Sequence, residues 1–342
     1  MALTRDQKIC KLGKIITDRA PVMLGVEKIT TDSPEYWGIS SGVNHGIDLY
    51  GEKIVDDALD LMLSMKRRVP QTKEQLMKKT GFDADYIETV LEACTQISLV
   101  EYNNENLDGK NPEHQKRWVL NMFVPGGAEI MVMRDELINK YPKAADFFER
   151  MAFLPLAGVT EFVPPGGAGI GMHVIPVEAA IPAETQSLPI EHISHWLEKY
   201  EGQIGVGICS CRRQQTIRGE GSGDTESYWC IGLGDFADFC RETGMGHDIT
   251  KEEALQILKD AEARGYVHQH TNIDGEDKIW GLCNCAVGVC NALRTSQLFN
   301  TPNLSASAYT ADVDAEKCVA CGKCVETCPA GAVRLGQKLC TK

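Results

Sequence analysis

The cysteines near the end of the chain have the spacing of an iron–sulfur ligand loop. The run reads C-x2-C-x2-C-x3-C-P and comprises Cys318, Cys321, Cys324, Cys328 and Pro329. In bacterial ferredoxin loops of this spacing, the thiolates wrap one corner of a [4Fe–4S] cubane. Structural zinc sites instead favour two separated C-x2-C pairs. The run predicts a protein that transfers electrons, senses redox state or builds a reaction site on iron.

A second group of cysteines lies upstream, in two similar motifs. The sequences GICSC at 207–211 and GLCNC at 281–285 follow short apolar segments that we expect to be strands. If those strands are neighbours, four to six thiolates face one volume, where they would repel or oxidise without a metal. A further cysteine is expected in the polar connection after the first motif, and another on a helix running toward Leu298. The six predicted ligands are Cys209, Cys211, Cys230, Cys283, Cys285 and Cys290.

The number of ligands leaves the pairing open. Cys328 can close a cluster with the other three cysteines of its loop, or help to bind a second cluster with upstream thiols, as in two-cluster ferredoxins. Either arrangement predicts about two metal sites, both expected to be [4Fe–4S] clusters, with zinc as the alternative upstream. Cys240 and Cys340 are candidate spare ligands, whereas Cys10 and Cys94 are interpreted as ordinary thiols.

Two arginines directly follow the first C-x-C pair. A cationic side chain beside a cluster stabilises the more negative, reduced state and raises its potential. We therefore predict that Arg212 and Arg213 lie beside the cofactor, with an anionic partner or a plain salt bridge as alternatives. His268 and His270 lie in a strand-like stretch and are interpreted as solvent-facing or core residues.

The elements expected over residues 51–123 resemble a winged helix-turn-helix. Apolar residues at helical spacing predict a first helix that ends before Pro70. Thr72 and Gln75 form a capping box for a second helix, and Gly81 precedes a third. Strands at 97–102 and 118–123 enclose a polar loop, which completes the order of helix, helix, helix, strand, wing and strand.

The charges of this unit argue against nucleic-acid binding. The third helix, which would read DNA, carries Asp83, Asp85, Glu88 and Glu92 but no Lys or Arg. Phosphate contacts require cationic side chains. The chain as a whole has a net charge of −13, which also disfavours anionic membranes. We therefore expect the unit to position or dock the protein.

The 342 residues suffice for two or three domains, and the predicted fold class is α+β. A Gly/Ser/Asn-rich loop is expected at 40–46 and one helix over 124–150. The glycine-rich stretch 162–172 lacks the context of a nucleotide loop and is interpreted as a linker. The predicted parts are an N-terminal arm (1–50), a winged-helix-like domain (51–123), a connecting region (124–189), a cysteine-rich α+β domain (190–300) and a ferredoxin-like segment (301–342).

Composition indicates a protein of the reducing, low-oxygen cytoplasm. No run approaches the roughly 18 apolar residues of a membrane span, and the first residues lack the apolar core of a secretion signal. Twelve of the 14 cysteines lie after residue 208, and such clustering in a reducing compartment indicates metal ligation.

The cysteine order of residues 170–335 resembles a family of ferredoxin-type 4Fe–4S-binding proteins of anaerobic bacteria and archaea. The shared pattern is Cys-x-Cys-Arg, a later cysteine, Cys-Asn-Cys followed by another cysteine, and the C-terminal loop. Ala286 and Val289 stand where further cysteines can occur in that family. The resemblance implies an electron-transfer subunit or module that serves a larger redox enzyme.

We therefore expect an iron–sulfur protein that relays single electrons to or from a partner oxidoreductase, expected to contain a flavin. It would be a component of an oxidoreductase complex rather than a stand-alone enzyme. One alternative is an iron–sulfur enzyme with an open coordination position on its cluster. Another is a redox-sensing regulator built on the winged helix. The sequence contains no set of catalytic side chains that supports a specific reaction.

Overall fold

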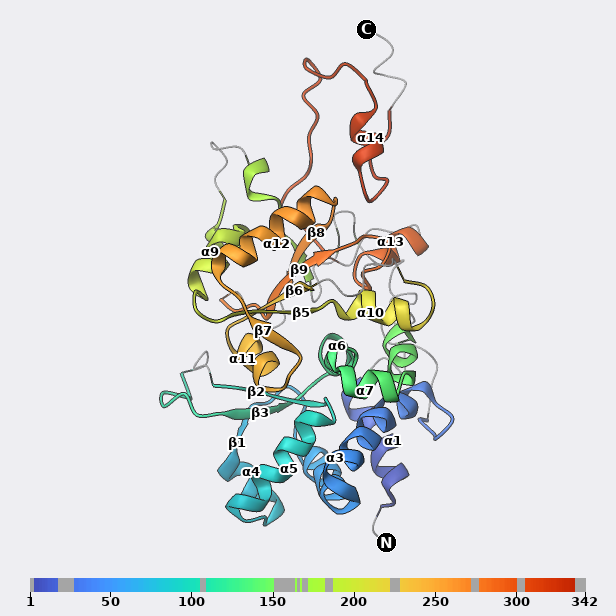
Figure 1. Cartoon of the computed structure of the whole chain (residues 1–342), viewed down its shortest axis with the longest axis vertical. Helices are drawn as coiled ribbons and strands as arrows, with labels where there is room; N and C mark the ends of the chain where they lie inside the picture. The colour runs from blue at the N-terminus through green and yellow to red at the C-terminus, as the bar shows by residue number, and fades with distance from the viewer. Residues whose placement is uncertain are drawn as a thin grey trace.

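The computed structural model describes residues 3–17, 28–104, 109–150, 164, 167, 172–181, 187–221, 228–271, 277–299 and 305–335. It combines helices with two antiparallel sheets, which agrees with the predicted α+β class. The N-terminal helices and the C-terminal helix α14 (Lys323–Thr327) lie at opposite ends of the long axis (Figure 1). Among the described residues, no helix is both long and apolar enough to cross a membrane.

The N-terminal unit packs helices beside a three-stranded sheet of order β1-β3-β2. The three helices and two strands predicted over 51–123 are present, although the first helix begins earlier than expected. The identification of this unit as a winged helix stays a prediction. Its elements are α1 (Arg5–Thr17), α3 (Pro34–Ser64), β1 (Gln71–Thr72), α4 (Lys73–Thr80), α5 (Ala84–Gln96), β2 (Val100–Asn103) and β3 (Arg117–Leu120).

The loop predicted at 40–46 is wrong, because these residues are part of α3. Their glycines permit close helix packing instead of a turn. A Cβ atom added at Gly42 would lie 2.3 Å from the carbonyl oxygen of Ile97, and one at Gly38 would lie 1.6 Å from the Phe147 ring. Residues four apart share a helix face, so Gly38, Gly42 and Gly46 form one flat stripe. The helix then kinks at Gly51, whose φ is 79°.

The single helix predicted over 124–150 is also wrong. A π-helical turn at Phe123–Gly127 leads into α6 (Ala128–Met133) and α7 (Asp135–Lys140), and residues 143–150 are helical again. Arg134 has an extended backbone, which separates α6 from α7, and Pro142 follows the end of α7 at Tyr141. Proline disfavours helical geometry in the residue before it, so the helix cannot continue through this point. Most of the glycine-rich stretch 162–172 lies outside the described residues.

The cysteine-rich part is built on a six-stranded antiparallel sheet of order β4-β8-β9-β6-β5-β7. Sequence order and spatial order differ, because β6 lies between β5 and β9. The strands are β4 (Met172–Val174), β5 (Ile204–Ile208), β6 (Tyr228–Leu233), β7 (Gly246–Asp248), β8 (Val267–Thr271) and β9 (Gly281–Cys285). The helices are α9 (Ile193–Lys199), α10 (Ser210–Ile217), α11 (Asp235–Glu242), α12 (Lys251–Ala263) and α13 (Arg294–Phe299).

Helices α9 and α12 cover one face of this sheet. Their apolar side chains form a core with alternate residues of β5, β6 and β9, such as Val206, Ile231 and Leu282. The capping box predicted for α12 is present, since Thr250 accepts from the backbone N–H of Glu253 and the Glu253 side chain accepts in return. The strand residues between these core residues face the opposite side of the sheet.

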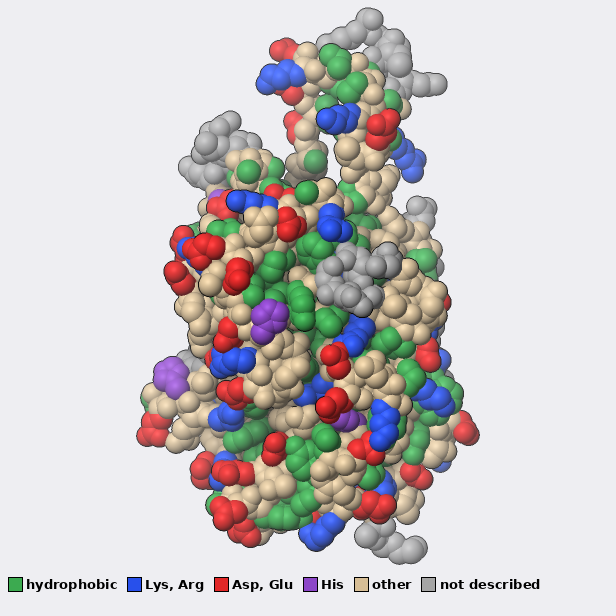
Figure 2. Space-filling view, viewed as in Figure 1, with side chains coloured by type: hydrophobic (Ala, Val, Ile, Leu, Met, Phe, Trp, Pro, Cys, Tyr) green, Lys and Arg blue, Asp and Glu red, His purple; other side chains and the backbone are tan. Residues whose placement is uncertain are grey.

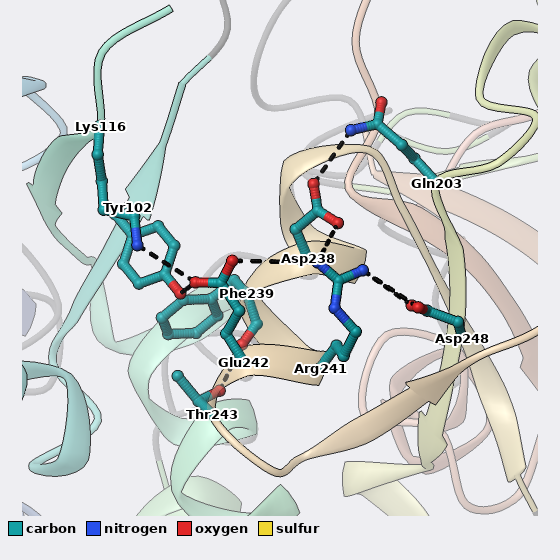
Figure 3. Close-up of polar contacts among 9 residues, drawn as sticks. All are labelled: Tyr102, Lys116, Gln203, Asp238, Phe239, Arg241, Glu242, Thr243 and Asp248. Atoms are coloured by element: carbon teal, nitrogen blue, oxygen red, sulfur yellow. Dashed lines mark hydrogen bonds and ion pairs between the residues drawn. The ribbon is translucent and has the colours of Figure 1, made fainter.

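Helix α11 joins the two sheets, since it packs against β5, β6 and β7 on one side and β2 on the other (Figure 1). Figure 3 shows the polar contacts at this junction. Glu242 of α11 accepts hydrogen bonds from Tyr102 and, at 3.2 Å, from Lys116. The Tyr102 ring also packs edge-on against Phe239, with 5.0 Å between ring centroids. The predicted domain boundaries stay predictions, but the two sheets are linked by both apolar and charged contacts.

Candidate iron–sulfur sites

The upstream cysteines are placed by three strands and two turns. Cys230 is part of β6 rather than of a connection, and Cys283 and Cys285 are part of β9 rather than beyond it. Cys290 precedes α13 in a turn instead of lying on a helix. Strands β5 and β9 are not direct neighbours, because β6 lies between them and contributes its own cysteine directly opposite Cys283.

The positions on the strands explain why the thiols meet. Cys230 and Cys283 are register partners on adjacent strands, and Cys285 lies two residues further along β9. Opposite partners and residues two apart share a sheet face. This face is the one opposite Leu282, which packs into the α9 and α12 core. At the end of β5, Cys209 is the N-cap of α10, and α10 carries Cys211.

The six thiols form a closed ring of contacts. The hydrogen-bonded neighbours, in order around the ring, are Cys209, Cys211, Cys290, Cys285, Cys283, Cys230 and again Cys209. Each sulfur therefore has two sulfur neighbours. Among the described residues, no set of His, Cys, Asp or Glu side chains stands ready to hold a single metal ion. In the arrangement described, the thiols hydrogen-bond to one another instead.

The contacts within the ring divide its thiols into two kinds. The pKa values of Cys209 and Cys290 lie well below the ordinary value, because each accepts a hydrogen bond from the Cys211 thiol. Burial opposes this shift. Donation to a neighbouring sulfur, together with burial, raises the pKa of Cys211 and of Cys230. Thiolate is the form that ligates metal. Metal binding at the ring would therefore release the remaining thiol protons.

Glycines allow the strands of the ring to approach closely. A Cβ atom at Gly281 would lie 2.0 Å from the carbonyl oxygen of Ile231, and one at Gly207 would lie 2.7 Å from the methyl carbon of Met133. These are the first residues of the two similar motifs. A larger residue at Gly281 would push β9 from β6 and move the cysteines that follow. At Gly207 the Met133 side chain would have to move, and the carbonyl oxygen of Met245 would lie 3.0 Å from the added Cβ atom.

The C-terminal loop forms a separate and more exposed site. Cys321 and Cys324 are exposed, while Cys318 and Cys328 are half-buried. Val319, between the first two cysteines, is 83% exposed. Left-handed backbone conformations at Ala320 and Gly322, with φ values of 52° and 79°, turn the chain into the short helix α14. The loop therefore presents two of its thiols to solvent.

The chain beyond α14 folds back over the sulfur of Cys328. The backbone N–H groups of residues 330–333 all hydrogen-bond to this sulfur. Burial raises the pKa of Cys328, but these four donors outweigh it and hold the pKa below its ordinary value. Backbone donors of this kind stabilise a thiolate ligand and tune the potential of a cluster that it binds.

Residues 311–334 match the family described as 4Fe-4S binding domain. The chain is an iron–sulfur protein. The match includes all four cysteines of the C-terminal loop and agrees with the predicted [4Fe–4S] cofactor. The comparison with curated proteins found no match, and the comparison with solved structures found none either.

Arg212 lies beside the ring in an environment that fits an anion. Its side chain is 1% exposed, and its Nη2 donates to the carbonyl oxygen of Asn284, between Cys283 and Cys285, at 3.1 Å. The Nε and Nη1 atoms are buried and have no hydrogen-bond partner. A buried, partly unpaired cation is costly. An iron–sulfur core with several thiolate ligands is anionic, so it would offset this cost.

Aromatic side chains hold the Arg212 guanidinium in place. It lies over the rings of Tyr266 and Trp229, with 4.4 and 5.2 Å to the ring centroids. Asn284 fixes the same region, because its amide donates to the carbonyl oxygen of Trp229 at 3.0 Å. The sequence did not predict Trp229, Tyr266 and Asn284 as parts of the site. Only Asn284, between two predicted ligands, carried a sequence signal.

Arg213 does not share this environment. It forms an ion pair with Asp135 and donates to the carbonyl oxygen of Met133 at 3.4 Å. Its neighbours thus belong to α6 and α7, on the side of the N-terminal unit. Of the two predicted arginines, Arg212 is the one that the structure brings to the thiols, and Arg213 matches the salt-bridge alternative.

The remaining cysteines and histidines lie outside the ring. Cys240 is buried in a core with Phe239 and Met245, and Cys94 donates to the carbonyl oxygen of Ala58 at 3.6 Å. Cys10 is half-buried on α1. Cys340 lies outside the described residues. His268 and His270 are both buried on β8, which agrees with the core interpretation.

The two candidate sites approach each other at Gly265. This residue follows α12 with a φ of 72°, and an added Cβ atom would lie 3.9 Å from the side chain of Pro329. Pro329 directly follows Cys328 of the C-terminal loop. Tyr266, next to Gly265, packs on Arg212. The residue after the last cysteine of the loop therefore lies near the turn that precedes Tyr266, the aromatic neighbour of Arg212.

Proposed function

We propose that the protein relays single electrons between a cluster in its C-terminal loop and a second iron–sulfur site in the six-cysteine ring, to or from a partner oxidoreductase. The observation that carries the proposal is the ring of six thiols next to the buried, partly unpaired Arg212. Iron–sulfur clusters supply one-electron redox chemistry when bound. The partner is expected to contain a flavin, since a flavin can exchange electrons one at a time.

The C-terminal loop is suited to meet the partner. Cys318, Cys321, Cys324 and Cys328 would ligate its cluster, and Cys321, Cys324 and the 83% exposed Val319 lie at the surface. Little protein would then separate this cluster from a docked donor or acceptor. The backbone donors of residues 330–333 would hold the Cys328 ligand in its thiolate form.

The ring is suited to an internal centre. Cys209, Cys285 and Cys290 are buried, and apolar side chains including Val287, Leu293 and Trp229 surround the thiols. Such a shell limits access of water and oxygen and lowers the local dielectric constant. Arg212 would place one positive charge beside this centre and favour its reduced state. Pro329 lies near Gly265, and the next residue, Tyr266, packs on Arg212, so the two proposed centres are expected to be close together.

The N-terminal unit is proposed to position the cysteine-rich part rather than to bind DNA. Arg134 donates to the carbonyl oxygens of Thr95, at the end of α5, and of Thr243, after α11, both at 3.0 Å. The third helix of the unit is thus fixed to the cysteine-rich part. Acidic and basic side chains are interspersed over the face in Figure 2. That distribution offers little to a phosphate backbone.

The proposal is tested by metal analysis and redox titration of the full chain purified without oxygen. We compare the wild type with a variant in which the four loop cysteines are Ala, and with one in which the six ring cysteines are Ala. Each variant is expected to lose iron and matching acid-labile sulfide and to retain one redox centre. Zinc in the ring, or a ring variant with the iron content of the wild type, would overturn the proposal. Cys240→Ala is the control, since this thiol lies outside both sites.

A further inference from the structure

The upstream ring has more sulfurs than one cubane requires. A [4Fe–4S] cluster is held by four cysteine thiolates, and the ring holds six. Four of the six contacts join thiols from different elements, and the other two lie within the C-x-C pairs. Because every sulfur has two sulfur neighbours, the ring has no gap that would set four ligands apart from two spare thiols.

The six positions are also equally well fixed by the fold. Cys230, Cys283 and Cys285 are held by the sheet register, and Cys209 and Cys211 by the start of α10. Cys290 is held by its turn, where its backbone N–H donates to Ala286, and by Gln269 of β8, whose Nε2 lies 3.7 Å from the sulfur. Gln269 is the register partner of Cys283 and lies on the same sheet face.

The number of sulfurs favours a large core over a small one. Six thiolates would carry six negative charges in a largely buried volume, and Arg212 could offset only one of them. Buried charges are stable only when they are paired or coordinate a metal. A single cubane would take up four of the sulfurs and leave two buried thiols of the ring without a metal partner, whereas a larger core can bind all six.

We propose that all six ring cysteines are ligands of one iron–sulfur centre that contains more iron than a single cubane. This inference rests on the proposed function, because it assumes that the ring binds iron and sulfide. Both C-x-C motifs, the β6 cysteine and the turn cysteine then have the same role. The two C-x-C motifs supply two ligands each. Cys290 lies between Cys211 and Cys285 in the ring, and Cys230 lies between Cys283 and Cys209.

The test uses the full chain with Cys318, Cys321, Cys324 and Cys328 replaced by Ala, so that iron in the loop does not contribute. Iron, zinc and acid-labile sulfide are measured per chain after anaerobic purification. Thiols that react with iodoacetamide are counted by mass spectrometry before and after chelation of the metal. We expect more than four irons with matching sulfide, and all six ring thiols protected until the metal is removed.

Single Ser variants of the six ring cysteines, made in the same background, provide the second measurement. Each is expected to lower the iron content or to change the absorption spectrum of the centre, whereas Cys240→Ser changes neither. Four irons with two reactive ring thiols would overturn the six-ligand centre and leave the relay intact. Zinc, or no metal, would overturn the proposed function as well.

Discussion

Replacing Arg212 by Met is expected to lower the midpoint potential of the upstream centre. The guanidinium follows Cys211 in sequence and donates to the carbonyl between Cys283 and Cys285. Its charge therefore lies close to several ring sulfurs. The reduced centre carries one more negative charge than the oxidised centre, so the loss of a nearby cation destabilises the reduced state.

The size of the shift follows from this proximity. Two unit charges about 8 Å apart interact by about 2 kcal/mol at an effective dielectric constant of about 20. For a one-electron couple about 59 mV corresponds to about 1.4 kcal/mol. The midpoint potential of Arg212→Met should therefore lie about 85 mV below that of the wild type. Arg212→Lys keeps the charge and should retain most of the wild-type potential.

The same substitution should leave the metal-free protein folded. It removes two unpaired buried nitrogens, which cost about 1–3 kcal/mol each. It also removes a charge-assisted hydrogen bond of about 1.5–3 kcal/mol and two cation–π contacts of about 1 kcal/mol each. These contributions nearly cancel. The unfolding free energy of the metal-free chain should then change by less than about 2 kcal/mol, as measured by anaerobic urea titration.

The assay is an anaerobic potentiometric titration followed by absorption and electron paramagnetic resonance. It is made in the background that lacks the four loop cysteines, so that one centre is observed. Arg213→Met is the matched control, because Arg213 pairs with Asp135 and lies on the side of α6 and α7. An unchanged potential in Arg212→Met, or an equal shift in Arg213→Met, would refute the electrostatic role of Arg212.

Three further predictions concern stability and pH. Gly42→Ala should lower the unfolding free energy by about 2 kcal/mol in thermal denaturation, because the added methyl group meets the carbonyl of Ile97. Gly288→Ala is the control, because an added Cβ atom there has no atom within 4 Å and should leave the unfolding free energy nearly unchanged. Equal effects of the two substitutions would contradict the packing role of the α3 stripe. Arg134→Met should lower the unfolding free energy by about 3 kcal/mol in urea titration, because the carbonyl oxygens of Thr95 and Thr243, on the two sides of the α11 junction, lose a charged donor. A variant as stable as the wild type would show that other contacts hold the junction. Burial raises the pKa of Glu129 from 4.5 to about 7, so the folded protein binds a proton that the unfolded chain releases. The unfolding free energy of the metal-free protein should therefore fall as pH rises from about 4.5 to 7, and Glu129→Gln should remove that slope.

Local patterns in the sequence predicted much of the fold. The Thr250 and Glu253 capping box, the strand at 204–208 and the helices around α4 and α5 depend on residues close in sequence, and all are present. The four C-terminal cysteines were equally visible, because a ferredoxin loop supplies its ligands from one short segment, and the family match includes them.

Features that depend on distant partners could not be predicted. The glycines of α3 have the composition of a loop, and only the positions of Phe147 and Ile97 show that they permit helix packing. Cys230 follows the polar stretch 219–227, which is typical of a connection, yet it lies in β6 and pairs with Cys283 at the centre of the sheet. Nothing near Arg212 in sequence indicates that Trp229 and Tyr266 enclose it. Strand order and burial are properties of the assembled sheet.

The placement of β6 between β5 and β9 has a consequence for biosynthesis. Cys209, Cys211 and Cys230 leave the ribosome more than 50 residues before Cys283, and β9 must then dock against β6 to complete the ring. Pairings between strands so far apart in sequence form late. Half of the thiols are therefore exposed to oxidants and stray metal ions while the chain is still being made. The proposed centre can therefore be loaded with metal only after β9 has been added, and the yield of loading should depend on how quickly this strand docks.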